Sequence, residues 1–350
     1  MQAKIQKCFD YAQERNLFSL CEIGIINSKA EVQKFRYLKE NYLKSLGQSD
    51  SEIPFVFDCA SITKTFPTGI LALMAIEEKR LDLNQPISEI LPDFKANNAE
   101  GASLLHLLTH TLDYRISLAC LRDETPSSIL KSLFEFDFPS APGESYLYCN
   151  ASSVVLGKVL DKVYQKPLAV LAQEKLFDPM GLKSTSFKPL EFADLKQIVP
   201  TEECTWRGRI IRGEVHDESA SAMQKDLENP NVGSAGLFST TDELLVFLQE
   251  VMNENSKIIS PFIRKMILQK HSLAGLELCL GWECNSPRWM PPMDRQILGK
   301  TGFTGQSILW DVEKELGLVI LCNSTWPKRP KTAEAINDFR KFCIRTILEE

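Results

Sequence analysis

The chain has 350 residues, of which 44% are hydrophobic and 25% are charged, and its formal net charge is −6. Since a single compact core rarely grows beyond about 250–300 residues, we expect one large two-lobed domain or two domains. No basic patch stands out, which argues against nucleic acid or an anionic membrane as a partner. No run of about 18 uninterrupted apolar residues exists, so we expect no transmembrane span.

The first 18 residues lack both an apolar run of signal-peptide length and a small-residue cleavage pattern. The ten cysteines form no C-x-x-C pair and have no metal-ligand spacing with the four histidines. Scattered thiols without an export signal are typical of the reducing cytoplasm, so we expect a cytoplasmic protein with no metal and no cofactor. A periplasmic or secreted location would require an export segment outside this sequence.

Hydrophobic periodicity predicts strands towards both ends of the chain and helices between them. The first helix places Ile5, Cys8, Phe9 and Ala12 on one face. The last helix places four apolar residues at helical spacing, namely Ile336, Phe339, Cys343 and Ile347. Strands are expected over residues 18–26, 31–38, 296–300, 306–312 and 316–323. Helices are expected over residues 61–79, 104–109, 127–134, 151–164, 167–176, 333–348 and from a capping box at Thr240 and Glu243 to Met252.

This order predicts an α+β fold in which both termini build one antiparallel sheet, helices flank the sheet, and a helical lobe is inserted. We expect a single catalytic domain over residues 1–350. Its sheet lobe would comprise residues 1–65 and 270–350, and its mainly helical lobe residues 66–269. A cleft where the lobe meets the sheet is a common place for a ligand pocket.

Ser61-x-x-Lys64 is the first motif that carries chemistry. A serine hydroxyl is a weak nucleophile at neutral pH and needs an adjacent base. Residues three apart share one helix face, and a helix N-terminus favours negative charge developing at the serine. Since a free lysine has a pKa of about 10.4, Lys64 becomes a base only where burial or a cation lowers that value. A charged Lys64 would instead lower the pKa of a phenol.

Ser128-x-x-Lys131 is a second match to the same pattern, so the pattern alone is weak. Ser61 follows the apolar segment 55–57 and opens a mostly apolar helix, whereas Ser128 lies inside a short helical segment. This context favours Ser61 as the nucleophile.

Tyr148-x-Asn150 follows a Pro-Gly turn signal. In an extended or loop segment, the two side chains would point the same way. The phenol could then relay a proton to or from a serine oxygen, and the amide could bind an acyl-group carbonyl. Taken alone, the tripeptide is far more often structural than catalytic.

Lys300-Thr301-Gly302 ends a strand-like segment. A lysine and a threonine at this position could bind an anionic group, and Gly302 would let a substrate approach the backbone closely. The backbone N–H groups of Phe303 and Ser61 could form an oxyanion hole. Loss of one such donor typically lowers kcat by ~10²–10³-fold. The alternative is an ordinary strand end.

S-x-x-K and K-T-G are signatures of β-lactamases and penicillin-binding proteins. The chain resembles the serine β-lactamase and penicillin-binding-protein superfamily from about residue 20 to about residue 345, in particular class C β-lactamases, D,D-peptidases and esterase-like members. Further segments that carry the resemblance are 58–64 (DCASITK), 104–111 (LLHLLTHT), 142–158 (PGESYLYCNASSVVLGK), 178–182 (DPMGL), 213–220 (GEVHDESA) and 233–240 (GSAGLFST).

The resemblance implies that Ser61 forms an acyl-enzyme and that Lys64 and Tyr148 share the general acid–base work. It also implies that Asn150 and the segment from Lys300 to Phe303 position the substrate. Many esterase-like relatives have histidine where this chain has Lys300, so the lysine favours a carboxylate-bearing substrate, such as a β-lactam or a D-amino-acid peptide. Two departures concern local geometry: Leu112-Asp113 stands where relatives often have Ser-Gly, and Pro67 is unusual.

We therefore expect a metal-free serine hydrolase that acts on a small-molecule or peptide substrate, either an ester or an amide. A carboxylesterase of the same fold is one alternative, and a non-catalytic penicillin-sensing or scaffold relative is another. A zinc hydrolase is a third reading, but His106 and His110 lack the glutamate of an H-E-x-x-H motif, so structural roles are expected for both. We expect His216 to line a loop or the cleft wall. The sequence gives no indication of the oligomeric state.

Overall fold

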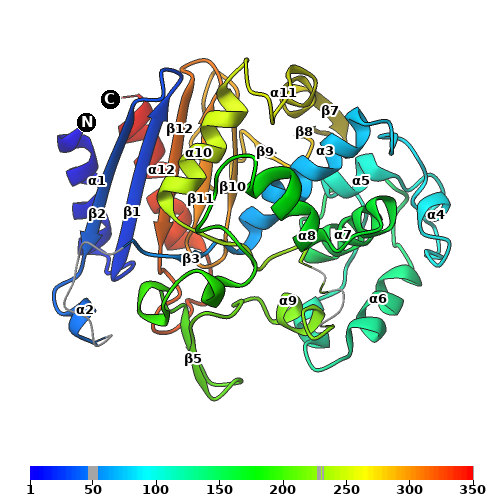
Figure 1. Cartoon of the computed structure of the whole chain (residues 1–350), viewed down its shortest axis with the longest axis horizontal. Coiled ribbons are helices and arrows are strands. Elements are labelled where there is room, and N and C mark those ends of the chain that lie inside the picture. Colours follow the sequence, from blue (N-terminus) through cyan, green and yellow to red (C-terminus); the bar gives the residue numbers. More distant parts are fainter. Residues whose placement is uncertain (46–53, 227–229, 231, 350) are drawn as a thin grey trace.

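A six-stranded antiparallel sheet is the centre of the fold. The computed structural model describes residues 1–45, 54–226, 230 and 232–349 (Figure 1). The strand order is β2-β1-β12-β11-β10-β9, and β1 pairs with β12 so that Cys21 lies opposite Cys322. The prediction of an α+β fold with one antiparallel sheet from both termini is therefore confirmed. The strands of this sheet are β1 (Leu20–Asn27), β2 (Val32–Leu38), β9 (Glu283–Cys284), β10 (Ile297–Thr301), β11 (Ser307–Asp311) and β12 (Leu316–Cys322).

Helices cover both faces of this sheet. Helices α1 (Gln2–Glu14) and α12 (Glu334–Leu348) pack on one face, and α10 (Thr241–Met252) crosses the other, in front of the strands in Figure 1. Gly24 of β1 permits the close approach of α10, since a Cβ there would lie 2.7 Å from the Thr241 side chain. The apolar positions predicted for the two terminal helices are all buried: Ile5, Cys8, Phe9, Ala12, Ile336, Phe339, Cys343 and Ile347.

The chain between the two halves of the sheet is mainly helical and forms the right-hand side of Figure 1. The helices predicted over residues 104–109, 127–134 and 151–164 are present, with ends that differ by at most one residue. The remaining α-helices are α2 (Tyr42–Ser45), α3 (Ile70–Glu77), α4 (Ile87–Ile90), α5 (Leu104–Thr109), α6 (Pro126–Phe134), α7 (Asn150–Tyr164), α8 (Leu168–Ala172), α9 (Glu218–Met223) and α11 (Pro261–Leu268). Short pairs of strands are β3 (Phe57–Asp58) with β6 (Phe238–Ser239), β4 (Glu202–Cys204) with β5 (Arg209–Ile211), and β7 (Lys270–Leu273) with β8 (Leu276–Cys279).

The helix predicted over residues 61–79 is wrong in its first half. A 3-10 helix (Ala60–Lys64) is followed by a wide turn (Thr65–Gly69), and the regular α-helix α3 begins only at Ile70. Phe66 has extended angles, φ −127° and ψ 116°, because Pro67 excludes the helical conformation from the residue before it. The helix from Ile70 confirms the second half of the prediction, and Pro67 divides the segment into two pieces.

Two other predicted helix details differ from the structure. The helix over residues 167–176 is regular only as far as Ala172 and continues as a wide turn (Gln173–Phe177). Thr240 caps α10 by accepting from the Glu243 N–H at 3.3 Å, but the Glu243 carboxylate accepts from backbone N–H groups of Lys183 and Ser184 instead of completing a capping box. Glu243 therefore connects α10 to the loop that contains Lys183 and Ser184.

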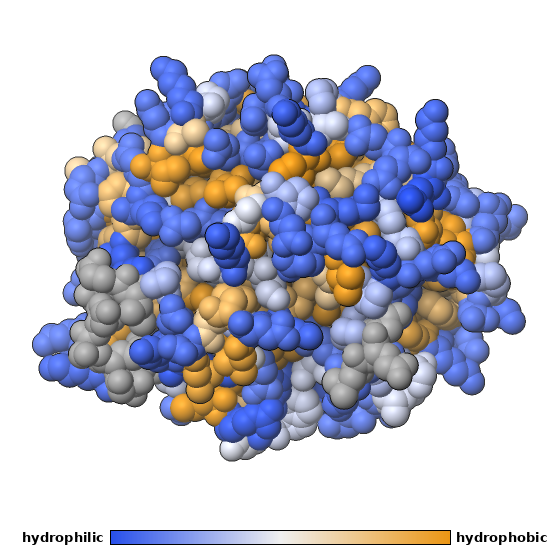
Figure 2. Space-filling view, in the orientation of Figure 1, coloured by the Kyte–Doolittle hydropathy of each residue, from blue (hydrophilic) through white to orange (hydrophobic). Residues whose placement is uncertain are grey.

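The molecular surface is mostly hydrophilic on the face shown in Figure 2. Exposed apolar side chains include Trp206 and Ile210 in the hairpin β4–β5, which protrudes at the lower edge of Figure 1. Within the ranges described above, none of the helices combines the length and the apolar character required to cross a bilayer.

Candidate active site

Ser61 is the second residue of the 3-10 helix (Ala60–Lys64), which follows a sharp turn after β3. Ala60, directly before it, has a φ of 46°, which is a left-handed conformation uncommon for a residue with a Cβ. The Ala60 N–H donates to the Asp58 carboxylate at 2.8 Å and so stabilises this conformation. The turn leaves Ser61 only partly buried at the start of a helical segment.

Lys64 follows Ser61 by one turn and is almost entirely buried. Its Nζ donates to Ser61 Oγ at 2.9 Å and to the carbonyl oxygen of Ser234 at 2.7 Å. Burial, and then the positive charge of Lys300, lowers the pKa of Lys64 to about 7. A substantial fraction of Lys64 is therefore neutral at neutral pH and able to accept a proton from the serine.

Tyr148 completes a group of three around the serine oxygen. Its side chain interacts with that of Ser61, which lowers the pKa of the phenol, and the side-chain nitrogens of Lys64 and Lys300 lie 5.5 Å and 4.2 Å from the centre of its ring. Burial and the Glu283 carboxylate raise the pKa of Tyr148 well above its usual value, although Ser61 and Arg288 oppose this. The phenol is therefore protonated and can donate its hydrogen.

Strand β10 brings the third motif, Lys300-Thr301-Gly302, against the nucleophile turn, which comprises residues 58–61. A Cβ at Gly302 would lie 2.6 Å from the carbonyl oxygen of Cys59 and 3.2 Å from the Cβ of Ala60, so only glycine permits this approach. The next residue, Phe303, has a side chain that is 49% exposed. Gly302 therefore packs against Cys59 and Ala60, the two residues that precede Ser61.

Lys300 has an internal counter-ion that sequence reasoning missed. Its Nζ lies 3.4 Å from the Glu283 carboxylate, and the residue is only 2% exposed. Although burial alone would raise the pKa of Glu283, Lys300 and Arg288 lower it to about 2, with help from a Trp289 hydrogen bond. Burial lowers the pKa of Lys300 in turn. Lys300 is therefore a buried member of an ion pair rather than a cation that faces solvent.

Arg288 is the more exposed cation next to the third motif. Its Nη2 donates to both Glu283 oxygens, at 3.0 and 3.1 Å, and to Thr301 Oγ1 at 2.9 Å. Its side chain is 46% exposed, so the guanidinium group is also open to solvent. Since a guanidinium has five N–H donors, Arg288 retains the capacity to bind an incoming anion beside Thr301.

Asn150 is the first residue of α7, not a member of an extended segment as expected. Its amide nitrogen donates to Asp217 at 2.9 Å and to the Ser219 hydroxyl at 3.1 Å. Burial would raise the pKa of Asp217, but the hydrogen bonds from Ser219 and the Ala220 N–H keep it below its usual value. Asp217 thus fixes the orientation of the Asn150 amide.

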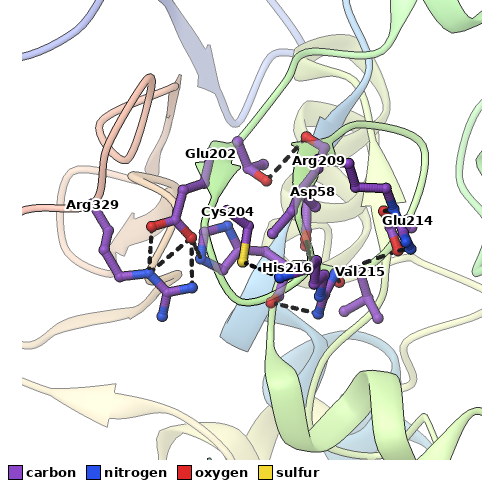
Figure 3. Close-up of polar contacts among 11 residues, drawn as sticks. Asp58, Glu202, Cys204, Arg209, Glu214, Val215, His216 and Arg329 are labelled. Carbon is purple, nitrogen blue, oxygen red and sulfur yellow. Dashed lines mark hydrogen bonds and ion pairs between the residues drawn. The ribbon is translucent and has the colours of Figure 1, made fainter.

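A second ionic cluster lies behind the nucleophile turn (Figure 3). The backbone N–H of His216 donates to the Asp58 carboxylate at 2.7 Å. The centre of the His216 ring lies 5.5 Å from that of the Phe303 ring. Arg329 donates to the Glu202 carboxylate at 2.6–2.9 Å, and that carboxylate lies 3.6 Å from the His216 ring. Burial and Arg329 lower the pKa of His216 to about 4, so the ring is neutral.

A cavity of about 300 Å³ adjoins the site on the side of β9, lined by Lys300, His110 and Tyr146 among others. His110 is buried with its ring 4.8 Å from that of Tyr148, and burial, Lys300 and Lys64 lower its pKa well below the usual value. His106 instead accepts from the Ser103 N–H at 3.1 Å at the start of α5. Neither histidine acts as half of a zinc-binding pair, and no three metal-ligating side chains converge within the described ranges.

The structure brings together Ser61, Lys64, Tyr148 and Lys300, and it keeps Ser128 apart from them on α6, where its hydroxyl donates to Glu124. Four residues that contact the candidate site escaped the sequence reasoning. Asp58 and Asp217 lie inside the quoted segments 58–64 and 213–220 but received no role there. Glu283 and Arg288 lie outside every quoted segment.

The fold is that of β-lactamases and penicillin-binding proteins. The structure of EstCE1, titled a hydrolase with promiscuous acyltransferase activity, aligns with a TM-score of 0.74 at 20% identity and covers 97% of this chain and 98% of that one. The D-alanine carboxypeptidase AmpC from Burkholderia cenocepacia aligns with a TM-score of 0.73 at 20% identity, over 99% of both chains.

Sequence comparison agrees with the fold. The N-acetylmuramyl-L-alanine amidase of Bacillus subtilis (strain 168) is 27% identical over 306 residues, which cover 77% of this chain and 68% of the relative. A putative D-alanyl-D-alanine carboxypeptidase of Salmonella agona (strain SL483) is 25% identical over 316 residues, which cover 81% and 72%.

The sequence model of the Beta-lactamase family matches residues 55–341. The chain belongs to this family, and it is a serine hydrolase of the β-lactamase and penicillin-binding-protein superfamily. The resemblance inferred from the three motifs is therefore confirmed.

Proposed function

We propose that this protein is an acyl-transfer hydrolase in which Ser61 forms an acyl-enzyme with a β-lactam, or with an amide or ester that carries a carboxylate on the leaving-group side. The observation that carries the proposal is the 2.9 Å hydrogen bond between Lys64 Nζ and Ser61 Oγ, together with a Lys64 pKa of about 7. A lysine that is neutral at working pH is a suitable general base for an adjacent serine.

In acylation, neutral Lys64 takes the proton from Ser61 Oγ while that oxygen attacks the substrate carbonyl carbon. The backbone N–H groups of Ser61 and Phe303 donate to the carbonyl oxygen as it becomes negative. Tyr148, which is protonated, donates its hydrogen to the leaving group, and the proton held by Lys64 replaces it. In deacylation the same groups activate a water molecule, which attacks the acyl carbon and releases Ser61.

The carboxylate requirement rests on Arg288 and Thr301. These two side chains are joined at 2.9 Å at the end of β10, and the exposed part of the guanidinium is free to form a charge-assisted bond with a carboxylate. The Lys300 side chain is paired with Glu283, and its nitrogen lies 4.2 Å from the centre of the Tyr148 ring. The Asn150 amide, oriented by Asp217, would bind the carbonyl of the acyl group.

Parallel turnover of three substrates tests the reaction class: a chromogenic cephalosporin, a D-alanyl amide and a short-chain nitrophenyl ester. We expect turnover of the cephalosporin or the amide, and loss of all turnover in Ser61→Ala. Turnover of the ester alone would favour a carboxylesterase of the same fold. The matched control is Ser128→Ala, which alters the second S-x-x-K sequence and should behave as wild type.

Covalent labelling tests the acyl-enzyme separately. A fluorophosphonate or a fluorescent penicillin should label the wild type and Ser128→Ala but not Ser61→Ala. If neither probe labels the wild type, the protein is a non-catalytic relative. Arg288→Leu tests the carboxylate site: KM should rise roughly 10- to 100-fold for the cephalosporin, because a hydrogen bond to a charged group contributes about 1.5–3 kcal/mol, and should not change for an uncharged ester.

A further inference from the structure

Cys279 ends β8 and Cys284 ends β9, and the two cysteines lie close together. Cys279 forms an isolated bridge with Trp282 across a tight turn, and Cys284 lies two residues beyond Trp282, so the alternation of side chains places both cysteines on one face. The Gln296 amide nitrogen donates to both sulfur atoms, at 3.7 and 3.9 Å. The two thiols also interact closely enough for each to shift the pKa of the other.

The thiol pair can be reached through the cavity beside the active site. Both cysteines line the cavity of about 300 Å³ that Lys300 and His110 also line. Cys279 is buried, whereas Cys284 is partly exposed. The interaction with Cys279 and the charge of Lys270 lower the pKa of Cys284 to about 7, against the effect of burial. Since the thiolate is the reactive form, Cys284 is the nucleophile of the pair.

The position of Cys284 connects the pair with the catalytic residues. Cys284 lies opposite Leu298 in β10, and the preceding residue, Glu283, lies opposite Gly299. Glu283 holds Lys300 and Arg288 through the contacts described above. A displacement of β9 would therefore move the carboxylate that fixes two cations of the active site.

We propose that Cys279 and Cys284 are an oxidation site for small peroxides, and that their disulfide reversibly lowers the activity of the hydrolase by displacing Glu283. The second half of this proposal rests on the proposed function. The Cys284 thiolate attacks one peroxide oxygen, the O–O bond breaks, and the second oxygen leaves as hydroxide and becomes water on protonation. The Cys279 sulfur then attacks the resulting sulfenic acid. The S–S bond forms, the S–O bond breaks, and a second water carries away the Cys279 proton.

The disulfide would require a small movement of the strands. Diagonal neighbours on paired strands have Cα atoms roughly 7–8 Å apart, whereas a disulfide is most often formed at about 5.5–6 Å. Closure therefore draws β9 towards β8 by on the order of 1–2 Å. Since β9 has only two residues and its first is Glu283, this movement falls on the ion pair with Lys300.

Peroxide titration of the folded, reduced protein, followed by alkylation, trypsin digestion and mass spectrometry, tests the thiol site. Residues 271–288 form a single tryptic peptide that contains both cysteines. We expect this peptide to lose two hydrogen atoms and its ability to be alkylated, and dithiothreitol to reverse both changes. Cys279→Ser and Cys284→Ser should each prevent the loss. Cys120→Ser, which removes an exposed thiol elsewhere, should respond as wild type.

Cys21 and Cys322 provide an internal comparison, because they lie opposite each other on β1 and β12 but are fully buried. They should stay reduced while the protein is folded. Oxidation of Cys120 or of this buried pair before the 279–284 pair would overturn the proposal.

Activity measured on the same samples tests the coupling to the active site. We expect kcat/KM to fall on the order of 10- to 100-fold on oxidation, because a displacement of about 1 Å at a positioning group can cost ~10²-fold. Reduction should restore it, and Cys284→Ser should not respond. A disulfide that forms without loss of activity would overturn the coupling. A protein that forms the disulfide but hydrolyses no substrate would contradict the proposed function and not the thiol site.

Discussion

Two ionic clusters flank the nucleophile turn, and each contains a buried glutamate held by an arginine. In the front cluster Arg288 holds Glu283, and in the rear cluster Arg329 holds Glu202. The front cluster has Lys300 as its third member, 4.2 Å from the Tyr148 ring, and its charge lowers the pKa of Lys64. In the rear cluster the third member is His216, whose neutral ring lies beside the ring of Phe303. The backbone N–H of His216 donates to Asp58. A glutamate–arginine ion pair therefore lies beside Lys300 in the front cluster and beside His216 in the rear cluster.

Removal of Lys64 tests whether the front cluster acts through this base. We expect Lys64→Ala to lower kcat/KM by ~10²–10⁴-fold, which is the usual contribution of a positioned general base. Steady-state kinetics with the best of the three substrates measures the effect. Lys131→Ala, which changes the lysine of the second S-x-x-K match, is the matched control and should retain full activity. An active Lys64→Ala protein would assign the base to another group.

Glu283→Gln and Glu202→Gln compare the two clusters directly. Breaking a buried ion pair costs about 3–5 kcal/mol, so both variants should have a lower free energy of unfolding. Only Glu283→Gln should also lower kcat/KM, on the order of 10- to 100-fold, because Lys300 and Arg288 lose the group that positions them. Urea unfolding and kinetics on the same preparations separate the two effects. Equal losses of activity would remove the distinction between the clusters.

The sequence predicted the residues that share a motif, but not the residues that hold them in place. Ser61 and Lys64 are three apart, and local spacing alone places them on one turn. Tyr148 and Lys300 had to be brought there by the fold, yet their motifs are specific enough in combination to predict it. Glu283 and Arg288 occur in no recognisable pattern, because nothing local distinguishes a carboxylate that will be buried beside a lysine.

The architecture followed from periodicity, and the local errors followed from single residues. Strands at both ends and helices between them predicted the antiparallel sheet. Pro67 interrupts the helix predicted from residue 61, and Phe66 before it has extended angles. Asn150 begins α7 instead of lying in the extended or loop segment that was predicted, and its amide is held by Asp217, 67 residues away in the sequence.

The pH dependence of acylation sharpens the comparison further. Because Lys64 must be neutral to accept the serine proton, kcat/KM should rise as pH increases through about 7, the pKa of Lys64. Lys300→Met removes a positive charge that disfavours protonated Lys64, so the midpoint should move to higher pH by roughly one unit, or about 1.4 kcal/mol. His216→Gln, in the rear cluster, should leave the midpoint unchanged. A pH profile that is the same in wild type and Lys300→Met would contradict the electrostatic role of the front cluster.

The smallest effect is expected at the point where the rear cluster reaches the nucleophile turn. Asp58 accepts from the Ala60 N–H at 2.8 Å and from the His216 N–H at 2.7 Å. Asp58→Asn would place an amide NH₂ against one of these N–H groups and lose a charge-assisted hydrogen bond, which costs about 1.5–3 kcal/mol. Since Ala60 would be held less firmly in its left-handed conformation, we expect kcat to fall roughly 3- to 10-fold with KM unchanged.

A matched substitution separates positioning from stability at Asp58. Asp311 is equally buried but pairs with Arg295 at 2.8 Å on the central sheet, so Asp311→Asn should lower the free energy of unfolding without changing kcat. Burial raises the pKa of Asp58 to about 6, so wild type should lose the same increment of kcat as pH falls below about 6. Asp58→Asn, which does not titrate, should not show this additional loss. If the two variants have the same kcat, Asp58 supports only the fold, and the rear cluster has no influence on the position of Ser61.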